Sequence, residues 1–242
     1  MRSISRLIVA AAALVVTLPA GAAEIRANPR AVVELFTSQG CSSCPKADAM
    51  FNELVKRGDV VALAWHVDYW DYIGWPDTFG AKANSDRQRA YAQSWGSSRI
   101  YTPQMVVNGR TGVVGSRDRE VEGAIGTAAL SVPVGVGLAG GMVEVEIGPH
   151  QGAGDAMVWL ITFKDHSEVT IERGENAGNV FDYTQIVTGK QMLGMWDAAS
   201  GTHLRLPVSA LTGDGSNGAA IIVQTEREGL PGPILGAASI QL

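Results

Sequence analysis

The feature that most constrains this chain is its only pair of cysteines, Cys41 and Cys44, which are separated by two serines. The pair lies between an apolar run at 31–36 and a helical pattern that begins near Pro45. A strand that leads into Cys-x-x-Cys at a helix N-terminus is typical of thiol–disulfide redox sites. The free N–H groups and partial positive charge of a helix start stabilise a thiolate. The spacing therefore predicts Cys41 as an attacking thiolate and Cys44 as a resolving thiol.

Two other interpretations of the cysteine pair stay open from the sequence. The first is an inert structural disulfide, although closing so short a ring constrains the unfolded chain by only about 2 kcal/mol in the loop-entropy model. The second is a metal site. Zinc requires more ligands than two thiolates, and only four histidines are present to help. A copper site using both thiolates and His66 is a variant of this second interpretation. The favoured prediction includes no metal and no cofactor.

Residues 1–23 are predicted to be a signal peptide that does not belong to the fold. Arg2 and Arg6 form a positive start, 7–18 is a short apolar segment, and 20–23 supplies small residues for signal peptidase. A membrane anchor is the alternative, but the apolar segment is short for a span, and no later segment reaches such a length without charge. We expect a mature chain without an integral membrane segment, periplasmic or secreted, where a disulfide persists.

The charge of the mature chain argues against nucleic acid as a partner. Loss of the leader removes two arginines and no acids, which makes the formal charge, −5 for the whole chain, two units more negative. An acidic chain without a basic cluster is a poor nucleic-acid binder. The remaining length suffices for one large domain or two small ones.

Residues 24–130 are predicted to form an α/β domain. Asn108-Gly109 is a strong hairpin-turn signal between two apolar runs. The segments follow the order strand, helix, strand, helical insert, hairpin and helix, with approximate ranges 32–36, 45–57, 60–65, 77–95, 105–114 and 116–128. This order matches the thioredoxin plan, in which two strands joined by a crossover helix precede a hairpin and a closing helix. The first domain is therefore predicted to be thioredoxin-like.

Residues 131–242 are predicted to form a second, all-β domain. Apolar residues alternate with glutamates in 143–147, and 157–163 is an almost entirely apolar run. Such alternation is expected of a strand with one buried face. Seven or eight short strands separated by turns rich in glycine, proline and asparagine predict a sandwich-like domain.

The dipeptide Thr102-Pro103 opens a strand downstream of the cysteines. Most X-Pro bonds are trans, but a proline at this point of the predicted order favours a cis bond that faces Cys41. The residue before such a proline offers backbone hydrogen bonds to a bound polypeptide. Thr102 and Pro103 are therefore predicted to bind the substrate chain.

Three more polar residues are candidates for the same site. Glu34 interrupts an apolar strand just before the cysteines, and a buried carboxylate there could carry the proton of Cys44; an outward-facing side chain on an edge strand is the alternative. His66 and Asp68 follow the predicted central strand at its carboxyl end, where sites in α/β folds lie. Both are predicted to help bind substrate, with a structural role as the alternative.

Several stretches resemble domain-of-unknown-function family 1223, which contains exported bacterial proteins with a thioredoxin-like fold. The most specific stretch is VELFTSQGCSSCP at 33–45. The others are HVDYWD at 66–71, YTPQ at 101–104 with NG at 108–109, GENAG at 174–178 and GPILGAA at 232–238. The resemblance extends over roughly 31–242, and it implies a fold and a compartment rather than a reaction.

The sequence as a whole predicts a thiol–disulfide oxidoreductase that acts on exported polypeptides carrying thiols or disulfides. A protein of a different class is the alternative: a non-catalytic module that binds a ligand or a protein in the groove of the same scaffold.

Overall fold

The computed structural model describes residues 23–242, so the signal peptide predicted at 1–23 lies outside the described residues except for its last position. The described part contains twelve strands, three α-helices and three short 3-10 helices. Their bounds are β1 Glu24–Ala27, β2 Ala31–Thr37, α1 Pro45–Val55, β3 Val60–His66, η1 Asp71–Ile73, α2 Lys82–Ser94, β4 Gln104–Val107, β5 Thr111–Val114, α3 Asp118–Gly126, β6 Val134–Ala139, β7 Met142–Ile147, β8 Ala156–Thr170, β9 Val180–Trp196, β10 Thr202–Pro207, η2 Val208–Ala210, η3 Gly213–Gly215, β11 Gly218–Arg227 and β12 Leu230–Gln241.

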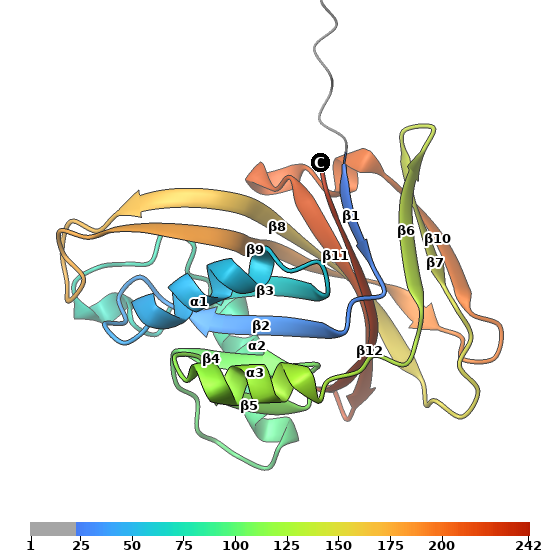
Figure 1. The fold of residues 1–242 in the computed structure, drawn as a ribbon, viewed down its shortest axis with the longest axis horizontal. Coiled ribbons are helices and arrows are strands. Elements are labelled where there is room, and N and C mark those ends of the chain that lie inside the picture. The colour runs from blue at the N-terminus through green and yellow to red at the C-terminus, as the bar shows by residue number, and fades with distance from the viewer. Residues whose placement is uncertain (1–22) are drawn as a thin grey trace, which may run out of the picture.

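One nine-stranded mixed sheet runs through the molecule in the order β1-β12-β11-β8-β9-β3-β2-β4-β5 (Figure 1). Strands β2 and β3 are parallel, and β4 and β5 continue the sheet in antiparallel fashion. On the other side, β3 pairs in parallel with β9, where Ala64 lies opposite Ile186. The first and second halves of the chain therefore share a single sheet.

This sheet shows that the predicted fold class is wrong. A thioredoxin-like α/β domain followed by a separate sandwich-like all-β domain is not formed, because four strands of the second half extend the sheet of the first and the described chain is mostly β. The physical reason lies in β8 and β9, which are continuous strands of 15 and 17 residues rather than several short ones. Their length carries β9 alongside β3. The domain boundary at residue 130 stays a prediction.

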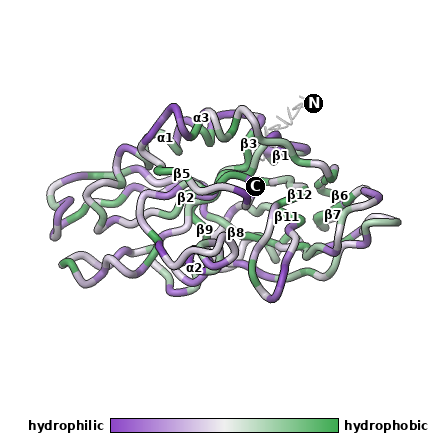
Figure 2. The backbone as a smooth tube through the Cα atoms, turned by 90° about the horizontal axis from the view of Figure 1, so that it is seen from below, coloured by the Kyte–Doolittle hydropathy of each residue, from purple (hydrophilic) through white to green (hydrophobic). Residues whose placement is uncertain are grey.

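Helices cover both faces of the β2–β5 part of the sheet. Phe51 of α1 and Ile125 of α3 pack with Leu35 in one buried cluster. On the opposite face, Tyr91 of α2 packs with Phe36 and with the core side chains of β3, β8 and β11. Alternate residues of β2 thus point to different cores, as the two-residue period of a strand requires. Figure 2 shows the hydrophobic residues gathered along the inner strands, with hydrophilic residues toward the outer turns.

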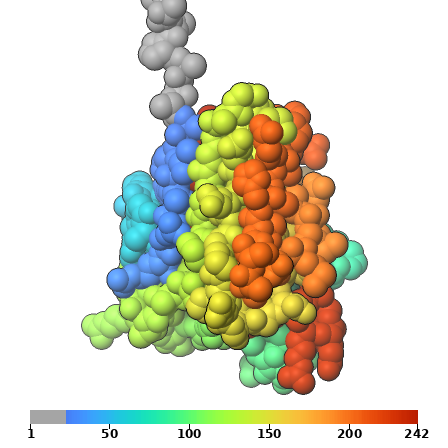
Figure 3. All heavy atoms as spheres, turned by 90° about the vertical axis from the view of Figure 1, so that its right-hand side faces the viewer, coloured from blue at the N-terminus to red at the C-terminus, as the bar shows by residue number. Residues whose placement is uncertain are grey.

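A separate three-stranded sheet, in the order β10-β7-β6, covers the other end of the large sheet. Apolar side chains of β6 and β7 form one buried cluster with those of β8, β11 and β12. Seen from the side, the yellow-green and orange strands of this small sheet form the outer surface (Figure 3). Within residues 23–242, no helix has both the length and the apolar character that crossing a membrane demands.

The predicted Asn-Gly hairpin is present between β4 and β5. Asn108 and Gly109 have φ values of 49° and 66°, the left-handed conformation that a type I′ turn requires. The Asn108 side-chain oxygen accepts the N–H of Val32 at 2.7 Å. A Cβ atom on Gly109 would lie 2.6 Å from the carbonyl oxygen of Gly232. Glycine at 109 therefore allows the hairpin to pack closely on β12.

Candidate functional site around the disulfide

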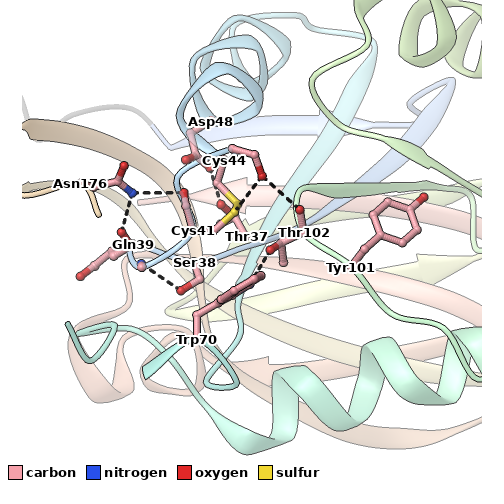
Figure 4. The surroundings of a disulfide bond; sticks show 12 residues. Thr37, Ser38, Gln39, Cys41, Cys44, Asp48, Trp70, Tyr101, Thr102 and Asn176 are labelled. Atoms are coloured by element: carbon pink, nitrogen blue, oxygen red, sulfur yellow. Dashed lines mark hydrogen bonds between the residues drawn. A yellow bond between two sulfur atoms is a disulfide. The ribbon is translucent and has the colours of Figure 1, made fainter. Parts of the chain in front are cut away.

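Cys41 and Cys44 form a disulfide at the N-terminus of α1, with their Cα atoms 5.4 Å apart (Figure 4). Cys44 is the residue that precedes the helix, and its carbonyl oxygen accepts the N–H groups of Ala47 and Asp48 at 2.8 and 3.0 Å. Pro45 occupies the first helical position, where a missing N–H is tolerated. The predicted layout of strand, disulfide and helix is therefore present locally.

The disulfide is covered rather than open to solvent. Cys41 exposes 2% of its surface and Cys44 0%. Part of the cover comes from the turn between β8 and β9, where the side-chain amide of Asn176 donates to the carbonyl oxygens of Gln39 at 2.8 Å and Cys41 at 3.1 Å. Asn176 belongs to the GENAG stretch, so a distant part of the chain holds the disulfide loop.

Thr102 and Trp70 lie on another side of the disulfide loop (Figure 4). The Thr102–Pro103 bond is cis, as predicted. The Ser43 hydroxyl donates to the Thr102 carbonyl oxygen at 3.4 Å, and the Trp70 indole N–H donates to the Thr102 hydroxyl at 2.6 Å (Figure 4). Thr102 therefore lies beside the disulfide loop, while direct contact between Pro103 and Cys41 stays a prediction.

Asp48 is the acidic group nearest to Cys44 along the helix, and it is buried. It follows Cys44 by one turn of α1 and accepts the hydroxyl of Thr37 at 2.7 Å (Figure 4). Burial raises the pKa of Asp48 to about 7, and this effect exceeds the opposing effects of the Thr37 hydrogen bond and the charge of His66. A carboxyl group with such a pKa exchanges its proton near neutral pH.

His66 and Asp77 complete a buried group of ionisable side chains next to Asp48. The Nδ1–H of His66 donates to the Asp77 carboxylate at 2.8 Å, and this carboxylate also accepts the N–H of Gln39 at 2.8 Å. Burial alone would lower the pKa of His66, but the charge and hydrogen bond of Asp77, with the charge of Asp48, raise it above its ordinary value. His66 Nε2 is buried without a hydrogen-bond partner among residues 23–242.

Glu34 is buried as predicted, with 0% exposure, but it does not lie beneath α1. It points to the opposite face of the sheet, where it forms an ion pair with Arg87 of α2 at 2.7 Å and accepts the Tyr91 hydroxyl at 2.5 Å. The two-residue period of β2 explains this placement, because Glu34 shares its face with Phe36 and not with Leu35. The structure therefore does not bring Glu34 to the disulfide.

The Asp68 carboxylate accepts the hydroxyl of Ser85 in α2 and, within residues 23–242, makes no hydrogen bond to the disulfide loop. The copper site considered from the sequence is not supported. Within residues 23–242, no three histidine, cysteine or acidic side chains are grouped closely enough to hold a metal ion.

The residues missed by sequence reasoning are Asp48, Asp77 and Asn176. Asp48 had a readable signal, since an acid occupies the otherwise apolar face of the helix between Ala47 and Phe51.

The fold and the site define a protein with one large mixed sheet and a covered Cys-x-x-Cys disulfide. The model of a family described as a protein of unknown function, DUF1223, matches residues 32–224, and the chain belongs to this family. The sequence resemblance to that family is thus confirmed. The chain is also similar to a protein from Agrobacterium tumefaciens whose X-ray structure is known. The two sequences are 37% identical, the structures superpose with a TM-score of 0.79, and the match covers 89% of this chain and 95% of that chain. No curated protein matches.

Proposed function

We propose that this protein exchanges disulfides with exported polypeptides in the periplasm through Cys41 and Cys44. The observation that carries the proposal is a disulfide at a helix N-terminus with a buried carboxyl, Asp48, one turn away and with a pKa of about 7. The helix start stabilises a leaving thiolate. The carboxyl group supplies or accepts the proton that must move whenever a thiolate becomes a thiol.

The exchange begins when a thiolate of the substrate attacks Cys41 Sγ. The bond between the two cysteines breaks, a mixed disulfide forms between the substrate and Cys41, and Cys44 leaves as a thiolate. Asp48 transfers its proton to this thiolate. A second substrate thiolate then attacks the substrate sulfur of the mixed disulfide and releases Cys41. The substrate dithiol is oxidised and the protein is reduced; the same steps in reverse, with a substrate disulfide, restore the protein.

The cover over the disulfide sets a condition on this reaction. Because Cys41 exposes only 2% of its surface, an attacking sulfur reaches it only after the Asn176 loop or the Trp70–Thr102 pair moves aside. Thr102, whose carbonyl oxygen lies 3.4 Å from the Ser43 hydroxyl, is then positioned to bind the incoming backbone.

The same burial favours a second candidate function. A disulfide with 2% and 0% exposed cysteines also suits a binding protein in which the bond only holds the loop at 38–44 in shape. In that case the sulfur atoms take part in no reaction, and the surrounding surface binds a ligand or a protein.

The experiment that separates the two functions uses purified Cys44→Ser and Cys41→Ser proteins with glutathione disulfide as the probe. If Cys41 is the attacking group, Cys44→Ser accumulates a glutathione adduct that a reductant removes, and Cys41→Ser does not. Mass spectrometry measures the adduct, and circular dichroism establishes that both proteins are folded. In cells, Cys44→Ser should likewise trap reducible adducts with exported proteins.

An unreactive Cys41 in folded Cys44→Ser would overturn the redox proposal in favour of the binding protein. A wild-type disulfide that is reduced only upon global unfolding would have the same meaning. Replacing Asp48 with Asn provides a further check, because it removes the proposed proton carrier. Exchange should then slow most below pH 7, where the wild-type carboxyl retains its proton.

A further inference from the structure

A cleft of about 730 Å³ lies on the face of the sheet opposite the disulfide. It is bounded by α2, by the β8–β9 strands and by the end of the β11–β12 hairpin. The volume is within the range of small-molecule binding sites. The side chains that matter for its chemistry are Trp65, Arg87, Trp159 and Lys190.

Arg87 and Trp65 line the cleft, and each has a donor atom that makes no hydrogen bond within residues 23–242. Arg87 is 7% exposed and uses Nε and Nη2 for Glu34, Tyr91 and Gln224, while its Nη1 makes no hydrogen bond within residues 23–242. Trp65 Nε1 is buried in the wall of the cleft, also without a partner in the described chain. Arg87 Nη1 is not enclosed by the protein, so it is open to an acceptor atom of a ligand in the cleft.

Lys190 supplies a cation at the mouth of the cleft. Its ammonium lies 3.4 Å from the centroid of the Trp159 ring and forms no ion pair within residues 23–242. The Lys190 side chain is exposed at the surface, and partial loss of water around its ammonium, followed by the charge of Arg87, lowers its pKa to about 8. A bound negative charge would offset both effects, because an opposite charge close by stabilises the ammonium form. A carboxylate that draws the ammonium off the Trp159 ring would free that face of the ring for aromatic stacking.

Acidic residues at the rim restrict the charge of the ligand. Asp86, Asp214 and Glu226 line the cleft, and of these Asp86 is already paired with Lys82 and Arg89. Asp214 and Glu226 are exposed and would repel a ligand that carries several negative charges. A phosphate or a polycarboxylate therefore fits this site less well than a single carboxylate.

We propose that this cleft binds a small aromatic monocarboxylate, with the carboxylate between Lys190 and the free edge of Arg87 and the ring against Trp159. Glu34, which fixes the other edge of Arg87, is then a positioning residue for this site. The proposal is independent of the disulfide chemistry, because the two sites lie on opposite faces of the sheet.

The test measures binding of naphthylacetate and its neutral amide, naphthylacetamide, to the full protein by isothermal titration calorimetry. The two probes share a ring system and differ in charge. The acid should bind about tenfold more tightly or better, as expected of a charge-assisted contact. Lys190→Gln should abolish that preference. Lys56→Gln, which removes an equal charge at the C-terminal end of α1 on the opposite face, should keep it.

Indole N–H signals in two-dimensional NMR locate the bound probe. Signals of Trp65 and Trp159 should shift, while that of Trp196, which donates to Gly148 in a different core, should not. The proposal is overturned if neither probe binds, if acid and amide bind equally, if the preference survives in Lys190→Gln, or if Trp65 and Trp159 are unaffected by a probe that binds.

Discussion

The amide of Asn176 lies 3.1 Å from the carbonyl oxygen of Cys41, although 135 residues separate the two in the chain. The same amide donates to the carbonyl oxygen of Gln39, so it holds both ends of the segment 39–41. These two hydrogen bonds connect the turn of the β8–β9 hairpin to the disulfide loop. Access to the sulfur atoms therefore depends on the hairpin as much as on α1.

Replacing Asn176 with Ala should speed reduction of the disulfide by dithiothreitol under native conditions. The buried carbonyl oxygen of Gln39 loses its donor, whereas that of Cys41 keeps the N–H of Cys44, so the loss costs roughly 1–3 kcal/mol for the one group left unsatisfied. Mass spectrometry of alkylated thiols measures the rate. Glu175→Ala is the matched control, because that neighbouring side chain is exposed. Equal rates in both variants would show that the loop does not control access.

Stability should fall as the pH rises from about 4 to about 7, and Asp48→Asn should remove much of this dependence. In that interval the unfolded chain has lost the Asp48 proton, at its ordinary pKa of 3.8, whereas the folded chain retains it, at about 7. The folded state thus binds more protons, and its stability declines with pH, by about 4 kcal/mol at most.

The raised pKa of His66 acts in the same direction, because its stabilising contribution is present at low pH and is lost as the pH rises through its folded pKa. Urea unfolding of wild type and Asp48→Asn at a series of pH values measures the difference. Parallel stability curves for the two proteins would contradict the assignment of Asp48.

Glu34→Gln should destabilise the fold without changing the chemistry of the disulfide. It leaves the buried guanidinium of Arg87 without its carboxylate, and breaking a buried ion pair costs about 3–5 kcal/mol. The rate of native-state reduction of Cys41–Cys44, and its pH profile, should match wild type at denaturant concentrations where both proteins are folded. A changed pH profile would return a proton-transfer role to Glu34.

Gly109→Ala should destabilise the protein far more than Gly58→Ala. The left-handed φ of Gly109 costs an L-residue about 1–2 kcal/mol, and the added methyl would lie 2.6 Å from the Gly232 carbonyl oxygen. Gly58 has no atom within 4 Å of its added Cβ. Thermal unfolding compares the two, and similar melting temperatures would refute the close approach of hairpin and β12.

Local patterns in the sequence predicted individual elements well. The apolar run at 60–65 is β3, and Asn108-Gly109 is the turn between β4 and β5. Burial of Glu34 followed from its apolar neighbours, but its partners did not, because they depend on which face α2 covers. The two-residue period of a strand predicts which side chains share a face of the sheet, but it does not predict which element packs on each face.

Local sequence patterns could not predict which distant strands pair with one another. The polar residues at 164–168 interrupt the apolar run of β8, although they are part of one strand, so the hairpin was predicted as separate pieces. Without its full length, nothing indicated that β9 reaches β3 or that its turn delivers Asn176 to the disulfide. Asp48 was within reach, because its position on the buried helix face is visible in the spacing alone.

The strand order of the large sheet has a consequence for how the chain acquires its structure. Glu24 in β1 pairs opposite Gln241 in β12, and β3 waits for β9 more than a hundred residues later. Pairings of such sequence separation form slowly, because the loop between them must close first. During synthesis from the N-terminus, β3 has an unpaired edge until β9 emerges. The early-made half is therefore vulnerable to wrong strand pairing for much of the time that the ribosome needs to complete the chain.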